Sequence, residues 1–287
     1  MKYLKYIYNS FRKKYKKFKE KSLKSINCKS ELPFTKYQLN NYILQNRESL
    51  SLVKNWIDEN SFINSCFNYG VPNFIKSDIN KKINSDQTYS DILLFLSNRY
   101  FDKVNYLEIG VSVGKNFFQL MNGLNDNSNL YGFDIENINP ILEKKIQIIK
   151  RDLWDTPLKS IKESQSSLTS YKYFQKNIVY VCGDVWDSFT WEKLSGQKFN
   201  IVFSDALHTP EAIQFEFEQL VKYSLLDKEF IIVWDDLENE METAFYKIIR
   251  KYKKHFNIKE IYLLKLNGWI GEHERKHNIG LISNFKF

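Results

Sequence analysis

The sequence predicts an α/β fold built on a mostly parallel sheet of seven strands whose last strand is antiparallel, preceded by a helical N-terminal extension. From about residue 104, short apolar segments alternate with amphipathic stretches, a pattern typical of parallel strands joined by crossover helices. The last two apolar segments are separated only by residues 267–277, which leaves no room for such a helix. We therefore expect them to form an antiparallel hairpin at the edge of the sheet.

The strands are expected where apolar residues run together between turn-forming residues. These segments are Asn105–Val111, Asn129–Asp134, Ile178–Cys182, Asn200–Ser204, Phe230–Trp234, Ile258–Leu266 and Ile279–Asn284. Two crossover helices are clearly marked. Thr209 can cap one helix and Pro210 suits its first position, while the other helix follows Leu237, where apolar residues recur at helical spacing.

Residues 1–24 differ from the rest of the chain in charge. They hold ten basic side chains and only Glu20 as an acid, so the other 263 residues carry about −1 of the total of +8. Apolar residues recur at helical spacing in this segment, which predicts a basic amphipathic helix over residues 1–28. Such a helix can pack on the body or on a second subunit, giving a homo-oligomer, or lie on an anionic membrane surface. Nucleic acid is the less favoured partner because the body of the chain is nearly neutral.

The helical extension, or lid, is expected over residues 29–101 and the main domain over 102–287. Residues 25–48 have the composition of a linker with a short helix, and further helices are predicted at Leu50–Phe67 and Tyr89–Tyr100. No apolar run reaches the roughly 20 residues of a membrane-spanning helix, and the N-terminus lacks the apolar core of a secretory signal. The three cysteines show no metal-binding or redox spacing. We therefore expect a cytoplasmic protein with reduced thiols.

A glycine-rich turn follows the first expected strand. The segment Glu108–Gly114 places Gly110 and Gly114 where a strand turns into a helix, which lets backbone N–H groups approach a ligand. Ser112 stands where a dinucleotide fingerprint needs its second glycine, and the spacing of the two glycines does not fit a phosphate-binding P-loop. Both of those ligand classes are excluded on spacing.

Acidic residues follow the next two strands. Asp134 ends the second strand, about twenty residues after the glycine turn, where a carboxylate can accept the ribose hydroxyls of a nucleoside. Asp184 and Trp186 follow the third strand. Each of these residues has a structural alternative, because an Asp also commonly caps a turn.

Three carboxylates are expected together at the ends of the fourth and fifth strands. Asp205 follows one strand, and Asp235 and Asp236 follow the other. Such a like-charged cluster is costly unless a cation neutralises it, and an oxygen-rich site suits Mg²⁺. The structural alternative is that Asp235 and Asp236 cap the helix that follows.

These motifs together resemble those of class I S-adenosylmethionine-dependent methyltransferases, over roughly residues 86–285. The resemblance implies a Rossmann-like seven-stranded sheet. It implies further that S-adenosyl-L-methionine is bound by Glu108, Gly110, Ser112, Gly114, Asp134, Asp184 and Trp186, the last two at the adenine.

Within this group the chain is most similar to the metal-dependent O-methyltransferases that modify small molecules and sugars, such as the macrocin and novobiocin-sugar type. That similarity implies Asp205, Asp235 and Asp236 as metal ligands and Asp205 with His208 as catalytic residues. Leu207 departs from the group, because many sugar-modifying members have an acidic residue at this position. The implied acceptor is a hydroxyl of a small molecule, sugar or glycan.

The substrate pocket is expected near the last hairpin, where residues 267–277 are polar and aromatic. The candidate substrate residues are Trp269, His273, Arg275 and His277. Two other functions remain open at this point. The chain could be a metal-independent methyltransferase acting on RNA or protein, or a non-catalytic interaction module that keeps the fold.

Overall fold

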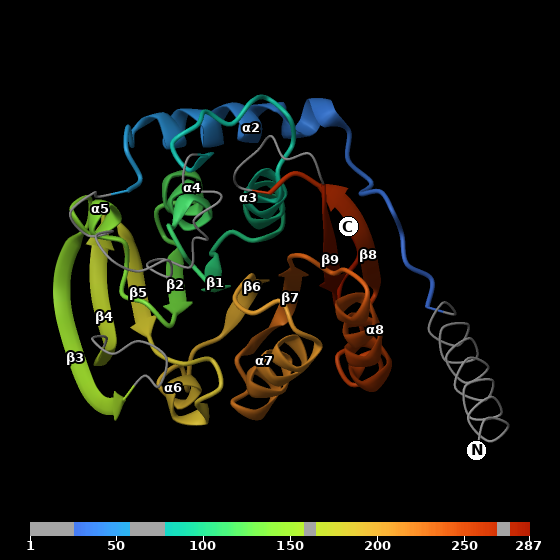
Figure 1. Ribbon diagram of the computed structural model, residues 1–287. Helices are drawn as coiled ribbons and strands as arrows, with labels where there is room; N and C mark the ends of the chain where they lie inside the picture. The colour runs from blue at the N-terminus through green and yellow to red at the C-terminus, as the bar shows by residue number, and fades with distance from the viewer. Residues whose placement is uncertain (1–25, 58–77, 158–164, 269–275) are drawn as a thin grey trace, which may run out of the picture.

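The computed structural model describes residues 26–57, 78–157, 165–268 and 276–287, and a nine-stranded sheet forms its centre (Figure 1). The strand order is β3-β4-β5-β2-β1-β6-β7-β9-β8. The strands are β1 Asn105–Ile109, β2 Asn129–Asp134, β3 Gln147–Pro157, β4 Gln165–Tyr173, β5 Lys176–Cys182, β6 Phe199–Ser204, β7 Leu226–Trp234, β8 Glu260–Leu266 and β9 His277–Ser283.

The central part of the sheet agrees with the predicted Rossmann-like arrangement. Strands β5, β2, β1, β6 and β7 run parallel, and β9 lies antiparallel between β7 and β8. The hairpin predicted at the edge of the sheet is therefore confirmed. Because the parallel strands end at the same edge, the residues that follow β1, β2, β5, β6 and β7 are brought together there.

The predicted number of strands was too low, because the structure adds the hairpin β3–β4 next to β5. Both ladders of this addition are antiparallel. The two strands were missed because they are not apolar runs. Ile149 and Leu153 of β3 are more than half exposed, and β4 alternates polar residues with few apolar ones. An outer strand with little burial leaves a weak hydrophobic pattern in the sequence.

Helices cover both faces of the sheet (Figure 1). Helices α2, α3 and α4 lie on one face, and α6, α7 and α8 lie on the other. The helix bounds are α2 Lys36–Ser51, α3 Tyr89–Tyr100, α4 Lys115–Gly123, α5 Pro140–Glu143, α6 Ser188–Glu192, α7 Pro210–Lys222 and α8 Glu240–Tyr252. Each face has its own cluster of buried apolar side chains, so the sheet is buried between two hydrophobic cores. This three-layer packing explains the continuous apolar runs of the central strands.

Of the two helices predicted between residues 49 and 101, one has the predicted bounds and the other differs. Helix α3 spans Tyr89–Tyr100, and Thr209 and Pro210 begin α7 as expected. Helix α2 begins within the segment predicted as a linker with a short helix and continues to Ser51. The helix expected at Leu50–Phe67 is not formed over residues 52–57, and residues 58–67 lie outside the described residues. Only five residues of α2 are buried, so its amphipathic pattern is weak and the sequence gives little indication of it.

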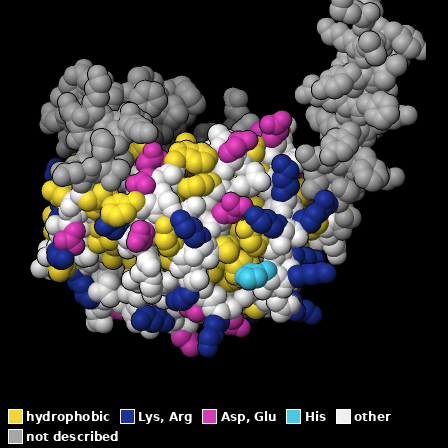
Figure 2. Space-filling model, turned by 90° about the horizontal axis from the view of Figure 1, so that it is seen from below, with side chains coloured by type: hydrophobic (Ala, Val, Ile, Leu, Met, Phe, Trp, Pro, Cys, Tyr) yellow, Lys and Arg dark blue, Asp and Glu magenta, His cyan; other side chains and the backbone are white. Residues whose placement is uncertain are grey.

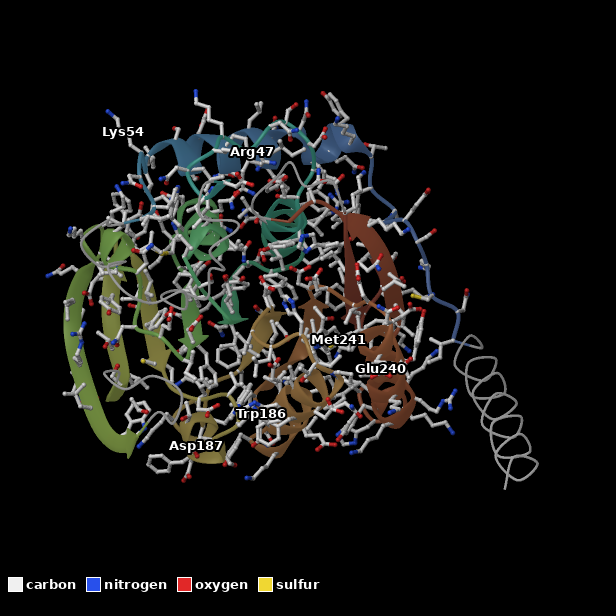
Figure 3. All side chains as sticks on the ribbon, in the orientation of Figure 1. Arg47, Lys54, Trp186, Asp187, Glu240 and Met241 are labelled. Carbon is white, nitrogen blue, oxygen red and sulfur yellow. The ribbon has the colours of Figure 1, made fainter. Side chains whose placement is uncertain are left out.

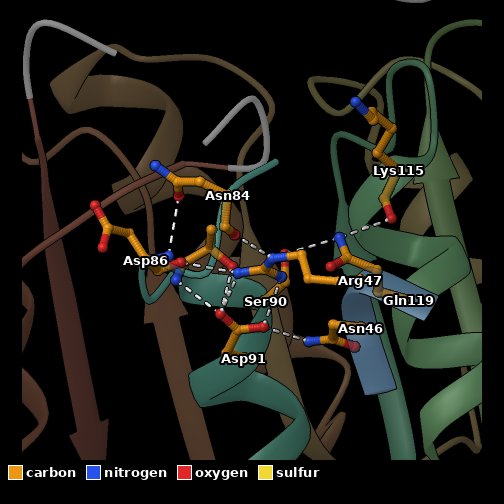
Figure 4. A network of polar contacts seen from close by, with 9 residues as sticks. Asn46, Arg47, Asn84, Asp86, Ser90, Asp91, Lys115 and Gln119 are labelled. Carbon is orange, nitrogen blue, oxygen red and sulfur yellow. Dashed lines mark hydrogen bonds and ion pairs between the residues drawn. The ribbon is translucent and has the colours of Figure 1, made fainter. Parts of the chain in front are cut away.

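A buried ion pair holds the extension together. The guanidinium of Arg47 on α2 contacts both carboxylate oxygens of Asp91 on α3, at 3.0 and 2.8 Å (Figure 4). Arg47 also donates to the backbone carbonyls of Asn84 and Asp86, at 2.7 and 2.8 Å. The extension therefore packs as part of the main core, where α2 and α3 both contact α4.

The outer edge of the sheet at β8 is covered by the segment that precedes α2. Lys29 pairs with Tyr262 in a parallel bridge, and its side chain forms an ion pair with Glu260. Most of the predicted basic helix of residues 1–28 lies outside the described residues. Within the described part of the chain, no helix has the length and apolarity needed to cross a membrane. On the face shown in Figure 2, basic and acidic side chains are interspersed among small apolar groups, with no uniformly basic surface.

Candidate active site

The turn after β1 has a backbone that only certain residues can adopt. Gly110 and Gly114 have φ values of 85° and 84°, and Ser112 between them has φ 52°. A Cβ atom on Gly110 would overlap the backbone of Asp205 and Ala206, so glycine is required there for close packing against the end of β6. Ser112 takes a left-handed conformation at a cost of about 1 kcal/mol, which is why glycine is the commoner residue in such turns.

The acidic residue of this motif is buried in a small hydrogen-bond network. Oε2 of Glu108 accepts hydrogen bonds from the Tyr106 hydroxyl at 2.6 Å and from Nδ2 of Asn116 at 2.8 Å. Burial raises the pKa of Glu108 well above its usual range, and the nearby charge of Asp205 adds to this, although the two donors oppose it. Glu108 thus lies between the glycine turn and the acidic residues after β6.

Asp134 at the end of β2 binds the backbone of the glycine turn through its side chain. Its Oδ2 accepts the backbone N–H groups of Val111 and Ser112 at 2.7 and 2.8 Å, and its Oδ1 accepts that of Glu136 at 2.9 Å. A carboxylate offers about four acceptor positions, so at most one is left for a ligand. Asp134 therefore stabilises the turn. It has too few acceptor positions left for the predicted contact with both ribose hydroxyls.

Asp184 and Trp186 lie beside Asp134, because Cys182 at the end of β5 pairs with Asp134 in the sheet. Oδ1 of Asp184 accepts the backbone N–H of Trp186 at 2.9 Å, which forms a local turn. The Trp186 ring is 44% exposed and packs against Phe215 of α7, with ring centroids 5.2 Å apart. Figure 3 shows Trp186 with Asp187 where β5 leads into α6.

The three aspartates predicted at the ends of β6 and β7 do lie at neighbouring strand ends. Ser204 pairs with Trp234, so Asp205 and Asp235 follow paired residues, and the Asp235 N–H donates to the Ser204 carbonyl at 3.0 Å. Two histidines join them. The predicted base His208 contacts Asp205 through Nε2 at 3.1 Å and Asp236 through Nδ1 at 3.2 Å.

The second histidine is His277, at the start of β9. Its Nδ1 lies 2.9 Å from Oδ1 of Asp235 and 3.1 Å from Oδ1 of Asp236. The sequence predicts His277 only as a residue of a substrate loop, whereas the antiparallel pairing of β9 with β7 brings it into the acidic cluster. Ligand atoms of Asp235, Asp236 and His277 all lie within 4.8 Å of one another, and Asp205 is joined to this group through His208.

The cluster strongly changes the proton affinities of its members. Burial raises the pKa of Asp205 to about 7, with the charge of Asp235 adding to the effect. Burial alone would lower the pKa of each histidine, but hydrogen bonds to the carboxylates outweigh it and raise the pKa of His208 to about 11 and that of His277 to about 10. Burial would likewise raise the pKa of Asp236, but the two imidazoles outweigh it and hold that pKa well below its usual range. The imidazoles are therefore protonated at neutral pH and balance part of the carboxylate charge.

A very small cavity lies between the glycine turn and Asp205 of this cluster. It is lined by Glu108, by the turn from Val111 to Asn116 and by Asp205. The predicted cofactor turn and the first predicted metal ligand therefore border the same space. Three of the predicted substrate residues, Trp269, His273 and Arg275, lie outside the described residues.

The structure adds one residue that the sequence did not suggest. Tyr89, the first residue of α3, donates its hydroxyl to Oδ2 of Asp205 at 3.3 Å. The only signal in the sequence is that Thr88 and Asp91 mark the beginning of a helix, which places Tyr89 but does not say what it contacts.

Comparison with known proteins agrees with this geometry. Residues 107–237, from β1 to just beyond β7, match a family of methyltransferase domains. A search of curated protein sequences found no match. This stretch is therefore similar to methyltransferase domains.

Solved methyltransferase structures show a distant similarity. The MycE methyltransferase from the mycinamycin biosynthetic pathway, in complex with Mg, SAH and mycinamycin VI, is 14% identical with a TM-score of 0.40; the match covers 63% of this chain but only 44% of MycE. The O-methyltransferase from Bacillus cereus in complex with SAH is 14% identical with a TM-score of 0.43, over 89% of this chain and 93% of that one. At these values neither similarity assigns an acceptor or a metal to this chain.

Proposed function

We propose that this class I S-adenosylmethionine-dependent methyltransferase methylates a hydroxyl of a small molecule or sugar, with a divalent cation at the acidic cluster. The observation that carries the proposal is the cavity bordered by both the glycine turn and Asp205. This proximity supports the proposal, because methyl transfer requires the cofactor and the acceptor to be adjacent.

The residues around the glycine turn fit S-adenosylmethionine, which supplies a methyl group on a positively charged sulfur when bound. The left-handed turn leads into α4, and its N-terminus favours the cofactor's carboxylate. Asp134 already accepts three backbone N–H groups, so it can bind at most one ribose hydroxyl. We propose Glu136, two residues further on, as the carboxylate that binds the second. Asp184 and Trp186 remain the proposed adenine contacts.

The acidic cluster fits a hard divalent cation such as Mg²⁺. Asp235, Asp236 and His277 offer ligand atoms within 4.8 Å of one another, and Asp205, which follows the neighbouring strand β6, is the proposed further anionic ligand. A cation there would bind acceptor oxygens and lower the pKa of the hydroxyl. In the metal-free protein, the two protonated histidines take over part of this charge compensation.

In the proposed reaction the acceptor oxygen forms a bond to the methyl carbon as the bond from carbon to sulfur breaks. S-adenosylhomocysteine leaves, and the hydroxyl proton passes to a base. His208 is the proposed base, with Asp205 holding its Nε2 side. It must first be neutral, and its contacts with Asp205 and Asp236 disfavour that form until other positive charge reaches these carboxylates.

The proposal is tested by measuring S-adenosylhomocysteine binding by calorimetry and then methyl transfer to a panel of sugar and phenolic hydroxyls, with and without EDTA. We expect cofactor binding, and turnover that EDTA removes and added Mg²⁺ restores. Turnover that EDTA leaves unchanged would overturn the cation and favour a metal-independent enzyme. Absence of cofactor binding would instead favour a non-catalytic module.

A further inference from the structure

Tyr89 belongs to the N-terminal extension but contacts the acidic cluster directly. Its side chain is fully buried, and its hydroxyl donates to Oδ2 of Asp205 at 3.3 Å. Its ring packs against Phe203, with centroids 4.8 Å apart, and meets the His277 ring edge-on at 6.4 Å. Tyr89 therefore contacts side chains of both β6, which Asp205 follows, and β9, which begins with His277.

The position of Tyr89 is fixed by contacts that do not involve Asp205. Its backbone N–H donates to the carbonyl of Asn267 at 3.0 Å, which ties the start of α3 to the loop after β8. Thr88 and Asp91 form a capping box, in which the Thr88 N–H donates to Asp91 at 2.8 Å. Arg47 of α2 binds the same carboxylate (Figure 4), so the loop after β8, the local capping box and α2 all fix the beginning of this helix.

Each oxygen of Asp205 thus has a different partner. Oδ1 lies 3.1 Å from Nε2 of His208, and Oδ2 accepts the Tyr89 hydroxyl. Two partners on opposite oxygens restrict rotation of a carboxylate about its last side-chain bond. Since His208 is partly exposed and is itself a proposed proton carrier, the rigid partner of the two is Tyr89.

We propose that Tyr89 is a positioning residue that orients the carboxylate of Asp205, so that the N-terminal extension completes the active site. The inference rests on the proposed function, in which Asp205 binds a divalent cation. Residues that orient a metal ligand commonly change metal affinity by about 10–100-fold when they are replaced. The extension is then required for cation binding as well as for stability.

The first test measures binding of MnCl₂ and of S-adenosylhomocysteine to the full chain by calorimetry. Tyr89→Phe keeps the ring and removes only the hydroxyl. We expect it to weaken Mn²⁺ binding by about tenfold and to leave S-adenosylhomocysteine binding unchanged. Tyr262→Phe is the matched control, because that hydroxyl also donates to a buried carboxylate, Glu260 at 2.8 Å, which has no contact with the acidic cluster among the described interactions. It should change neither affinity.

A purely structural role for Tyr89 would lower stability without changing the affinity of the folded protein for Mn²⁺. Equal Mn²⁺ affinity in Tyr89→Phe and the wild type would therefore overturn the inference and leave the proposed cation site standing. The inference would also be overturned if Tyr262→Phe weakened Mn²⁺ binding as much as Tyr89→Phe does.

A double-mutant cycle on the free energy of unfolding separates this inference from the proposed function. Tyr89→Phe, Asp205→Ala and the double variant are compared in urea without metal. Non-additive effects would show that Tyr89 acts through Asp205 even if the wild type binds no Mn²⁺, a result that would overturn only the cation site. Additive effects would overturn the positioning role itself.

Discussion

At the end of β2, the buried carboxylate of Asp134 is balanced by backbone N–H groups, whereas the carboxylates after β6 and β7 are balanced by the imidazoles of His208 and His277. Backbone donors are fixed by the fold and cannot leave without unfolding it. Histidine side chains can turn away or lose a proton, so their place can be taken by a cation. The first region is therefore a rigid support for the glycine turn, and the second is the one in which we expect the balancing charge to be exchangeable.

The largest effect is expected where a charge is removed from the exchangeable region. Asp205→Asn keeps the size of the side chain and deletes an anionic ligand. We expect this variant to lose turnover and to lose the thermal stabilisation that Mg²⁺ gives the wild type, as followed by thermal unfolding with and without MgCl₂. Asp152→Asn, on the exposed part of β3, is the control and should behave as the wild type does. Undiminished turnover in Asp205→Asn would mean that no cation acts there.

The rigid region is tested by Asp134→Ala, which leaves three backbone N–H groups without their acceptor. We expect the free energy of unfolding to fall by about 2–4 kcal/mol and S-adenosylhomocysteine binding to weaken by about 1–3 kcal/mol, measured by urea unfolding and calorimetry.

The comparison variant is Glu136→Gln, which should weaken cofactor binding with little loss of stability. We infer that Asp134 supports the cofactor-binding turn, whereas Glu136 contacts the cofactor. This inference would be wrong if Asp134→Ala were destabilised but bound the cofactor normally. In that case Asp134 would have no part in the site.

Among the described residues, the carboxylate of Glu216 is hydrogen-bonded neither to several backbone N–H groups nor to an imidazole, and we expect its contribution to stability to depend on pH. Glu216 of α7 is buried, and its Oε2 accepts the Ser204 hydroxyl at 2.6 Å. Burial raises its pKa from 4.5 to about 8. The folded state therefore binds more protons than the unfolded state between these values, and the stability that Glu216 contributes is lost as the pH rises from about 4.5 to about 8.

Glu216→Gln should remove this dependence. Urea unfolding between pH 5 and pH 8 should show the variant gaining stability over the wild type as the pH rises, by at most about 1.4 kcal/mol per pH unit. Parallel pH profiles of the two proteins would show that Glu216 is charged throughout this range.

The smallest effect on the site is expected from deleting residues 1–24. They carry the excess positive charge of the chain and none of the strand-end motifs. We expect the deletion to lower the isoelectric point and any salt-sensitive self-association or membrane binding, and to leave cofactor and Mg²⁺ binding unchanged. Loss of cofactor binding would place this segment in the fold of the active site.

The sequence alone determined the central sheet and the positions of its motifs. Buried parallel strands are continuous apolar runs, and the residues that follow them must meet at one edge, so Asp134, Asp205 and Asp235 could be brought together from their spacing. The connection between the last two strands was short enough to require an antiparallel pair. Local patterns suffice for such features because buried strands are visible as apolar runs and chain direction is constrained by the lengths of the connections.

The tertiary structure decided which groups balance which charges. His277 reaches Asp235 only because β9 is inserted between β7 and β8, and Tyr89 reaches Asp205 across 116 residues because α3 packs against the sheet. The hairpin β3–β4 was not predicted, because β3 is largely exposed and the buried residues of β4 are mostly polar. The extent of α2 was not predicted either, because only five of its residues are buried and they leave little periodic pattern. Contacts between side chains far apart in the chain depend on how whole elements pack, and no local pattern of residues records them.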